Sequence, residues 1–259
     1  MAIGRPHRKM KVAQLGPVPP PFGGVASNML AIHEALIADG NESLLVDVTN
    51  RKDRPQRPDV VKPGSAASLL KMLASSNCDI IHYHIGGAFR PKLAFLTMFC
   101  GILPGKKSVV TFHSGGFAKE AAEHATPYSL RGTAFRSVDV LIGVNAQMIE
   151  MFHAFGVPPV RTRIIHPFEL KRPDPAVAIP ADLVPFIGRT GLLVLSVGSL
   201  EPEYLNEFLI RSMPAVRQRH PGARLLIVGS GSEESSFRRL IRETGHEEYI
   251  PLPRNPDTY

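Results

Sequence analysis

Short apolar runs alternate with amphipathic segments along nearly the whole chain. The first half contains runs typical of buried strands at 11–15, 42–48, 79–83, 108–112, 138–144 and 163–166. Between them, apolar residues recur at helical spacing and predict helices at 24–39, 65–75, 91–103 and 146–155. This alternation is typical of β-α-β units, which build a parallel sheet between layers of helices. The first half is therefore expected to be one α/β domain.

The pattern is interrupted once and then restarts. Residues 169–191 are rich in proline and small or polar residues, which favours a linker. Further strands are predicted at 192–197, 224–228 and 249–252, with helices at 203–218 and 233–244. Three strands leave the apolar helix faces poorly covered. We therefore expect a complete domain at 1–168, a linker at 169–191 and an incomplete domain at 192–259.

The composition is that of a folded, soluble protein. Hydrophobic residues make up 44% of the chain and charged residues 20%, near the averages for globular proteins. Prolines after the first strand exclude a signal-peptide core, and the apolar run at 93–103 is too short to span a membrane. Cys78 and Cys100 lack metal-type spacing, which fits a reducing compartment. A cytoplasmic location is expected.

A net charge of +7 indicates an anionic partner. Nucleotides, phosphorylated lipids, membrane surfaces and nucleic acids all fit this charge, but the sequence has no helix-turn-helix, zinc or RRM-like pattern, so nucleic acid is not expected. Arg90, Lys92, Lys106 and Lys107 flank the apolar segment 91–103. That segment is interpreted either as a core helix with solvated ends or as a helix that contacts the inner face of a membrane.

A glycine- and proline-rich turn, 16–24, joins the first strand to the first helix. Gly23 and Gly24 allow a ligand to approach the backbone closely, and free N–H groups at a helix start attract phosphate. The turn lacks the GxGxxG fingerprint, which argues against an NAD-dependent oxidoreductase.

Three histidines lie near the carboxyl ends of predicted strands, where α/β proteins bind ligands. His82 and His84 share one face of a strand, but no Asp or Glu adjoins them as a third ligand. We therefore expect no metal, and a hydrogen-bonded structural role for at least one of the two. His113 is followed by Ser114 and then by Gly115 and Gly116, and it could donate a hydrogen bond to a sugar hydroxyl or a leaving phosphate.

The second half repeats the strand-turn-helix arrangement at 224–244. Gly229 and Gly231 lie in its turn, and Ser232 is expected to cap the helix that follows.

In their order and spacing, these motifs resemble those of glycosyltransferases of family 4. The resemblance covers 11–252 and rests on the turn with Gly23-Gly24, Asp79-Ile-Ile-His-Tyr-His84, Val110-Thr-Phe-His113, Val197-Gly-Ser-Leu-Glu-Pro202 and Pro221-Gly-Ala-Arg-Leu-Leu-Ile-Val-Gly-Ser-Gly231. It implies an α/β fold of the GT-B type, with two Rossmann-like, doubly wound parallel-sheet domains of which the second is truncated.

The resemblance also implies a reaction. A sugar would pass from a nucleotide-sugar donor to a glycan or lipid-linked acceptor, with retention of configuration and without a metal or cofactor, in polysaccharide or glycolipid biosynthesis. The implied site residues are His113 near the reacting sugar, Gly23 and Gly24 at the donor phosphates, Gly198, Ser199, Gly229 and Gly231 on the nucleotide side, and His84 and Asn145 on the acceptor side.

Two departures from the family pattern affect this expectation. Ser199 and Tyr204 occupy positions where many members have Arg and Lys, whose charges would neutralise the donor diphosphate. The family's paired acidic motif would fall after Tyr259, so the chain is expected to be a fragment with little activity alone. The alternative is a non-catalytic α/β protein that binds a sugar or phosphate.

Overall fold

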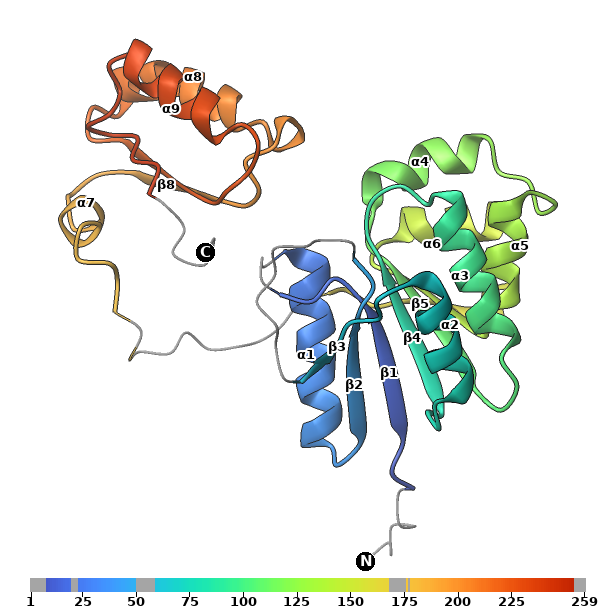
Figure 1. Cartoon of the computed structure of the whole chain (residues 1–259). Helices are drawn as coiled ribbons and strands as arrows, with labels where there is room; N and C mark the ends of the chain where they lie inside the picture. The colour runs from blue at the N-terminus through green and yellow to red at the C-terminus, as the bar shows by residue number, and fades with distance from the viewer. Residues whose placement is uncertain (1–7, 20–22, 50–58, 168–175, 177, 254–259) are drawn as a thin grey trace, which may run out of the picture. The chain divides into compact units, whose positions relative to one another are not determined.

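A seven-stranded parallel sheet forms the centre of the first of two structural units (Figure 1). In space the strands run in the order β3-β2-β1-β4-β5-β6-β7. Their bounds are β1 (Lys11–Gly16), β2 (Glu42–Asp47), β3 (Val60–Val61), β4 (Ile80–Ile85), β5 (Lys107–Phe112), β6 (Val140–Gly143) and β7 (Thr162–Ile164). The order reverses beside β1, so the carboxyl ends of β1 and β4 flank a topological switch point, where open α/β sheets bind ligands.

The computed structural model describes residues 8–19, 23–49, 59–167, 176 and 178–253. Its contacts divide the chain into Met1–Glu169, the first unit, and Leu170–Tyr259, the second unit. Residues 50–58, which include Arg51, Lys52, Arg54 and Arg57, lie outside the described residues.

Helices cover the two faces of the sheet unequally. The helices of the first unit are α1 (Gly24–Ala38), α2 (Ala66–Ser75), α3 (Pro91–Ile102), α4 (Gly115–Glu123), α5 (Leu130–Ser137) and α6 (Ala146–Ala154), with a 3-10 turn at Pro159–Arg161. Helices α2 to α6 pack on one face and share one apolar core with it. Helix α1 packs on the other face, where its Met29 contacts Leu45 of β2. The alternation of strand residues explains this division, because neighbouring residues point to opposite faces.

Phenylalanines dominate the larger core. The ring of Phe135 stacks on that of Phe89 at a centroid separation of 4.6 Å, and Phe112, Phe152 and Phe155 meet it at steeper angles. All five side chains are almost completely buried. Such aromatic burial is a major stabilising contribution and fixes β5, the strand that ends beside His113.

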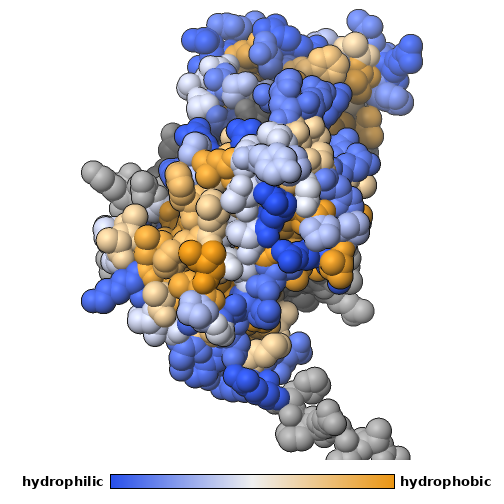
Figure 2. All heavy atoms as spheres, turned by 90° about the vertical axis from the view of Figure 1, so that its right-hand side faces the viewer, coloured by the Kyte–Doolittle hydropathy of each residue, from blue (hydrophilic) through white to orange (hydrophobic). Residues whose placement is uncertain are grey.

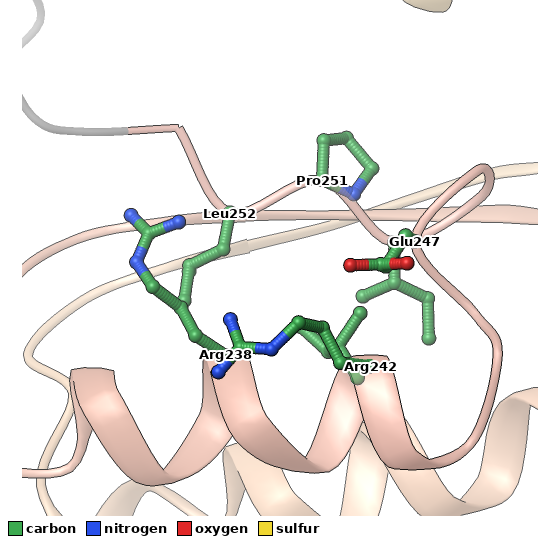
Figure 3. A pocket seen from close by; sticks show the side chains of 7 residues that line it. Arg238, Arg242, Glu247, Pro251 and Leu252 are labelled. Carbon is green, nitrogen blue, oxygen red and sulfur yellow. The ribbon is translucent and has the colours of Figure 1, made fainter.

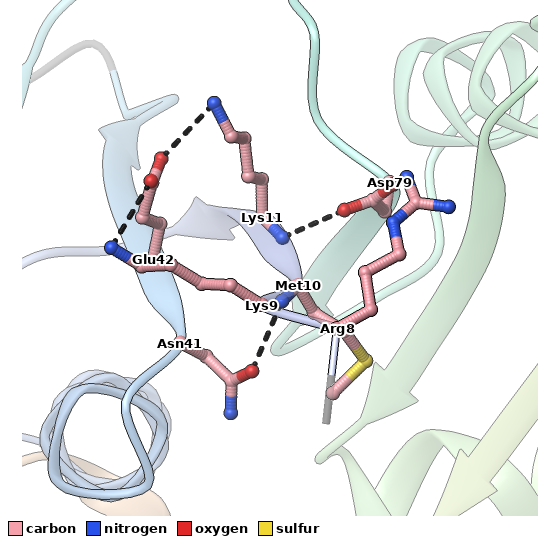
Figure 4. Close-up of polar contacts among 7 residues, drawn as sticks. All are labelled: Arg8, Lys9, Met10, Lys11, Asn41, Glu42 and Asp79. Atoms are coloured by element: carbon pink, nitrogen blue, oxygen red, sulfur yellow. Dashed lines mark hydrogen bonds and ion pairs between the residues drawn. The ribbon is translucent and has the colours of Figure 1, made fainter. Parts of the chain in front are cut away.

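The amino end of the sheet is closed by polar contacts (Figure 4). The Asp79 carboxylate accepts a hydrogen bond from the Lys11 backbone N–H at 2.9 Å and pairs with Arg8 at 2.6 Å. Glu42 pairs with Lys9 and Lys11 at 3.3 and 3.4 Å. These charges surround the amino ends of β1, β2 and β4, so structural contacts join the three strands at this edge.

The second unit is a small α/β layer. Strands β8 (Leu193–Val197) and β9 (Arg224–Val228) pair in parallel, and α8 (Asn206–Arg219) and α9 (Glu234–Glu243) pack against them around a separate apolar core. A 3-10 turn, Pro202–Tyr204, precedes α8. Residues 249–252, predicted as a strand, are not assigned as one. They still lie beside β9, because the Leu225 and Ile227 N–H groups donate to the carbonyls of Tyr249 and Pro251.

Several local predictions differ from the structure. Strand β3 and helices α4 and α5 were not predicted from the sequence. The end of the expected linker is folded: it contains α7 (Val184–Ile187), whose Phe186 is buried and whose carbonyl accepts a hydrogen bond from Arg224. Ser232 does not cap a helix. Its hydroxyl and N–H instead donate to the Glu201 carboxylate, and α9 begins two residues later.

Candidate active site

The candidate site lies at the carboxyl edge of the sheet, where β1, β4 and β5 end beside the start of α1. Gly16 ends β1, and a Cβ there would lie 2.8 Å from the Met29 sulfur and 3.1 Å from the His84 Cβ. Any side chain at this position would therefore crowd Met29 of α1 and His84, both of which approach the strand closely. At the end of β4, a Cβ on Gly86 would lie 2.9 Å from Val25. The first turn of α1 thus contacts the strand that carries His84.

Three histidines form a connected group at this edge. His84 Nδ1 and His113 Nε2 are 3.4 Å apart, and the two rings are stacked with centroids 5.7 Å apart. His82 Nε2 is hydrogen-bonded to the Thr111 hydroxyl at 2.7 Å, as expected for a structural histidine. The His82 ring also lies against His84, with centroids 4.1 Å apart. The structure therefore brings the predicted residues His84 and His113 together.

Burial keeps these histidines neutral. It lowers the pKa of His82 to about 4, with a smaller contribution from His113, and it lowers the pKa of His113 to about 4. The pKa of His84 is also well below its ordinary value, first because of burial and then because of the neighbouring His82 and His113. Each ring therefore has one N–H donor and one acceptor nitrogen at neutral pH. Such a group can hydrogen-bond sugar hydroxyls or phosphate oxygens without carrying charge.

We expect acid to destabilise the first unit because of these depressed pKa values. An unfolded histidine takes up a proton near pH 6.5, whereas folded His82 stays neutral until about pH 4. The unfolded state therefore binds more protons between these values, and stability is lost as the pH falls from 6.5 towards 4. For His82 alone the free energy of unfolding should drop by about 2 kcal/mol between pH 7 and 5. Urea titrations at several pH values measure this drop.

A His82→Asn variant is the control for this pH dependence. It retains a polar side chain near Thr111 and cannot titrate, so its stability should depend less on pH than that of the wild-type protein. Equal slopes for the two proteins between pH 7 and 5 would contradict the assignment.

The start of α1 is open. A Cβ on either Gly23 or Gly24 would have no heavy atom within 4 Å, and both residues are exposed. No side chain caps this helix end, so packing among the described residues does not explain the two glycines. An exposed helix start with free N–H groups is suited to bind an anion. The phosphate-binding role of Gly23 and Gly24 stays a prediction.

Asn145 has a structural function in addition to its predicted one. Its side-chain oxygen accepts a hydrogen bond from the Met148 N–H at 3.0 Å and caps α6. The cap alone is a sufficient reason for an asparagine at this position. Contact between Asn145 and an acceptor substrate stays a prediction.

The glycines of the second unit are packed against backbone. A Cβ on Gly229 would lie 1.8 Å from the Gly198 carbonyl oxygen, and a Cβ on Gly231 would lie 2.4 Å from that of Leu200. Hydrogen bonds from Gly198 N–H to the Val228 carbonyl and from Leu200 N–H to the Ser230 carbonyl join the two turns. Gly229 and Gly231 are thus required by the fold, whatever ligand binds nearby.

The two positions that depart from the family pattern are accessible. Ser199 is exposed, and 54% of the Tyr204 surface is exposed. A pocket of about 170 Å³ in the same unit lies between α9 and 247–252 (Figure 3). Arg238 and Arg242 extend from α9 along its rim, and Arg238 is paired with Glu234 at 2.9 Å. The residues that line this pocket include none of the predicted nucleotide-side positions.

Comparisons with known proteins identify the family. The model of Glycosyltransferase Family 4 matches residues 22–168, which include the histidine group and the start of α1. The chain belongs to glycosyltransferase family 4. A curated member from Corynebacterium glutamicum, a GDP-mannose-dependent monoacylated alpha-(1-6)-phosphatidylinositol monomannoside mannosyltransferase, is 36% identical over 112 residues. The match covers 41% of this chain and 29% of that protein, so it spans less than a third of the relative's length.

Solved structures share the fold of this family 4 chain. Anabaena HepE in complex with UDP and glucose superposes with a TM-score of 0.64 at 16% identity, over 96% of this chain and 70% of that one. WaaG, a glycosyltransferase involved in lipopolysaccharide biosynthesis, superposes with a TM-score of 0.63 at 15% identity, over 95% and 70% of the two chains. These likenesses confirm the predicted α/β fold of the GT-B type, with one Rossmann-like domain and part of another.

Sequence reasoning missed two residues of the histidine group. Gln14 is fully buried in β1 and lies 3.3 Å from His84, and Thr111 bonds His82. The sequence did contain a signal for Gln14, because a buried strand rarely carries a polar glutamine between apolar neighbours. Within the described part of the chain, no group of three or more His, Cys, Asp or Glu side chains is placed to hold a metal ion.

Proposed function

We propose that this protein transfers a sugar from a nucleotide-sugar donor, with the donor bound at the carboxyl edge of the first sheet. One observation supports this most directly: in a family 4 chain, neutral His113 lies at the same sheet edge as the open start of α1. The helix amides are suited to the donor phosphates, and the His113 ring to a sugar hydroxyl or a leaving phosphate oxygen.

The proposed reaction is retaining and independent of metal. Helix amides and a histidine N–H can stabilise negative charge on a departing diphosphate through preorganised hydrogen bonds. Gly198, Ser199, Gly229 and Gly231 are proposed to lie on the nucleotide side, and no cofactor beyond the donor is required. Polysaccharide or glycolipid biosynthesis is the proposed setting.

Calorimetry with UDP- and GDP-sugars, followed by product analysis, tests the proposal. The relative named above uses GDP-mannose and HepE binds UDP with glucose, so both bases belong in the screen. Saturable binding together with slow sugar transfer to a lipid or glycan acceptor is the expected result for this chain alone. Binding without transfer would support the alternative, a non-catalytic sugar- or phosphate-binding protein. Absence of binding to every donor would refute the proposal.

Helix α3 is the proposed contact with a membrane that carries a lipid-linked acceptor. No helix among the described residues is long and apolar enough to cross a bilayer. Yet 60% of Phe95 and 71% of Ile102 in α3 are exposed. Figure 2 shows that apolar and hydrophilic surface alternate on the side of the first unit turned towards the viewer. Exposed Arg90 and Lys92 precede these side chains and would attract anionic lipid. We propose that the protein works at the cytoplasmic face of a membrane.

We expect the double substitution Phe95→Ser and Ile102→Ser to weaken binding to vesicles of phosphatidylcholine and phosphatidylglycerol at least tenfold, because two large apolar contacts are lost. Sedimentation of the protein with these vesicles measures the change. Val160→Ser, at an exposed valine outside α3 (75% exposed), is the matched control and should bind as the wild-type protein does. Equal binding of the double variant and the wild-type protein would contradict the proposed contact.

A further inference from the structure

A series of polar side chains, of which Gln14, His33 and His84 are buried, connects His113 to the interior of the first unit. Gln14 lies between His84, on the neighbouring strand β4, and Ser43 on β2, and Ser43 Oγ lies 2.9 Å from His33 Nδ1 on α1. The order of contacts is therefore His33, Ser43, Gln14, His84 and His113. Gln14 is fully buried and His84 is 2% exposed, so their hydrogen bonds must be satisfied within the protein.

The two orientations of the Gln14 amide are not equivalent. With its oxygen towards β4, that oxygen lies 3.2 Å from the Met29 carbonyl oxygen, and the amide nitrogen lies 3.1 Å from the His33 backbone N–H. Two acceptors then face each other, as do two donors. With its nitrogen towards β4, the amide donates to His84 Nε2 at 3.3 Å and to the Met29 carbonyl, and its oxygen accepts from Ser43 Oγ at 2.9 Å and from the His33 N–H.

Only the second orientation satisfies all the hydrogen bonds of this buried amide. Unpaired buried donors and facing acceptors are strongly unfavourable, so the second orientation is favoured. In it, His84 Nε2 is an acceptor, and the hydrogen of neutral His84 is on Nδ1. That Nδ1–H donates to His113 Nε2, the nitrogen 3.4 Å away. The hydrogen of neutral His113 is then on its own Nδ1.

We infer that Gln14, acting through His84, fixes the tautomer of His113 so that its remaining ring nitrogen is a hydrogen-bond donor. Among the described residues, His113 Nδ1 has no protein partner, so it is available to a ligand. A donor at this place suits an oxygen acceptor, such as a sugar hydroxyl or a phosphate oxygen. The reverse orientation of Gln14 would exchange donor and acceptor in every hydrogen bond of this series. His113 Nδ1 would then carry no hydrogen and could only accept. Gln14 and His84 are thus positioning residues.

This inference deepens the proposed function, since the ligand it prepares for is the nucleotide sugar. The tautomers themselves can be measured in the free protein without any donor. Failure of sugar transfer would therefore leave the inference testable, and failure of the inference would leave the proposed function testable.

Long-range proton–nitrogen NMR of protein labelled with ¹⁵N-histidine provides the test, because protonated and bare ring nitrogens resonate far apart. Spectra of His84→Gln and His113→Gln assign the two rings. We expect both rings to be protonated on Nδ1 in the wild-type protein at neutral pH. An Nε2–H tautomer at His113 would overturn the inference.

Gln14→Glu and Ser43→Ala form a matched pair. A carboxylate at position 14 can only accept, so it should draw the His84 hydrogen to Nε2 and move the His113 hydrogen to Nε2 as well. Ser43→Ala removes one contact of the Gln14 oxygen but leaves the Met29 and His33 backbone groups, so the His113 tautomer should be unchanged. If Gln14→Glu does not fold, Gln14→Leu replaces it and should give a mixture of His113 tautomers. A folded position-14 variant with the wild-type tautomer would overturn the inference.

Sugar transfer gives a second measurement on the same variants. Gln14→Glu should lower the transfer rate constant about 10²-fold, the effect of losing one preorganised donor, while Ser43→Ala should stay near the wild-type rate.

Discussion

Replacing Gly229 with alanine should destabilise the second unit by about 3 kcal/mol or more, at the upper end of the cost of overpacking. The new methyl group would be placed 1.8 Å from the Gly198 carbonyl oxygen, a distance at which one of the two turns must move. Movement would break the hydrogen bonds that join 198–200 to 228–230. A small α/β unit has only a modest margin of stability, so most of it should unfold.

Hydrogen exchange followed by mass spectrometry measures this effect for each unit separately. In Gly229→Ala, the amides of β8, β9, α8 and α9 should lose protection, while those of the seven-stranded sheet keep it. Gly198→Ala is the matched control in the same pair of turns, because its Cβ would meet the Tyr204 ring at an ordinary 3.5 Å. Wild-type protection in Gly229→Ala, or equal losses in the two variants, would show that the close approach is not required.

The glycines at the two predicted ligand edges thus differ in kind. Gly229 and Gly231 are needed because another backbone lies where their side chains would be. Gly23 and Gly24 meet nothing within 4 Å, so alanine there should leave the fold intact. A loss of donor binding without a loss of stability in Gly24→Ala would therefore point to ligand contact. The sequence motif alone does not make this distinction, because glycine-rich turns after strands look alike in both cases.

The regular elements of the first unit followed from the sequence because their periodicity is strong. Strands such as 108–112 and 138–144 are rich in β-branched and apolar residues, and apolar residues in helix 24–39 recur at helical spacing. The misses have physical reasons. Strand β3 has only two residues, and α5 is a short helix with many polar residues whose burial depends on packing against α3. Segment 184–187 was interpreted as linker because its proline signal is local, whereas its fold depends on the distant Arg224.

The site could be predicted in part. Histidines at the carboxyl ends of strands predicted a group at one sheet edge, and the structure brings His84 and His113 together there because parallel strands end at the same edge. Their mutual geometry could not be predicted, because it depends on the β4–β5 register, in which His84 faces Thr111. Gln14 was missed for a similar reason: a single polar residue in an apolar strand gains meaning only when its cross-strand neighbours are known.

Replacing His113 with alanine should lower the rate constant for sugar transfer about 10²- to 10³-fold, the usual effect of removing one hydrogen bond donor aimed at developing charge. The His113 ring is the half-buried end of the histidine group, so its loss should remove the proposed ligand contact and leave the sheet core unchanged. Because its pKa is about 4, the ring acts as a neutral donor, and the rate should not fall between pH 8 and 6 through protonation of this residue. Initial rates with the donor identified by calorimetry measure both effects.

His124→Ala is the matched control, because His124 follows α4 and is exposed. Its transfer rate should equal that of the wild-type protein. His113→Gln tests the chemistry further, since its amide can still donate a hydrogen bond but cannot reproduce the ring geometry, and it should recover part of the lost rate. A His113→Ala protein that transfers sugar within threefold of the wild-type rate would show that this ring is not part of the reacting site. The histidine group would then have only a structural function, like the bond of His82 to Thr111.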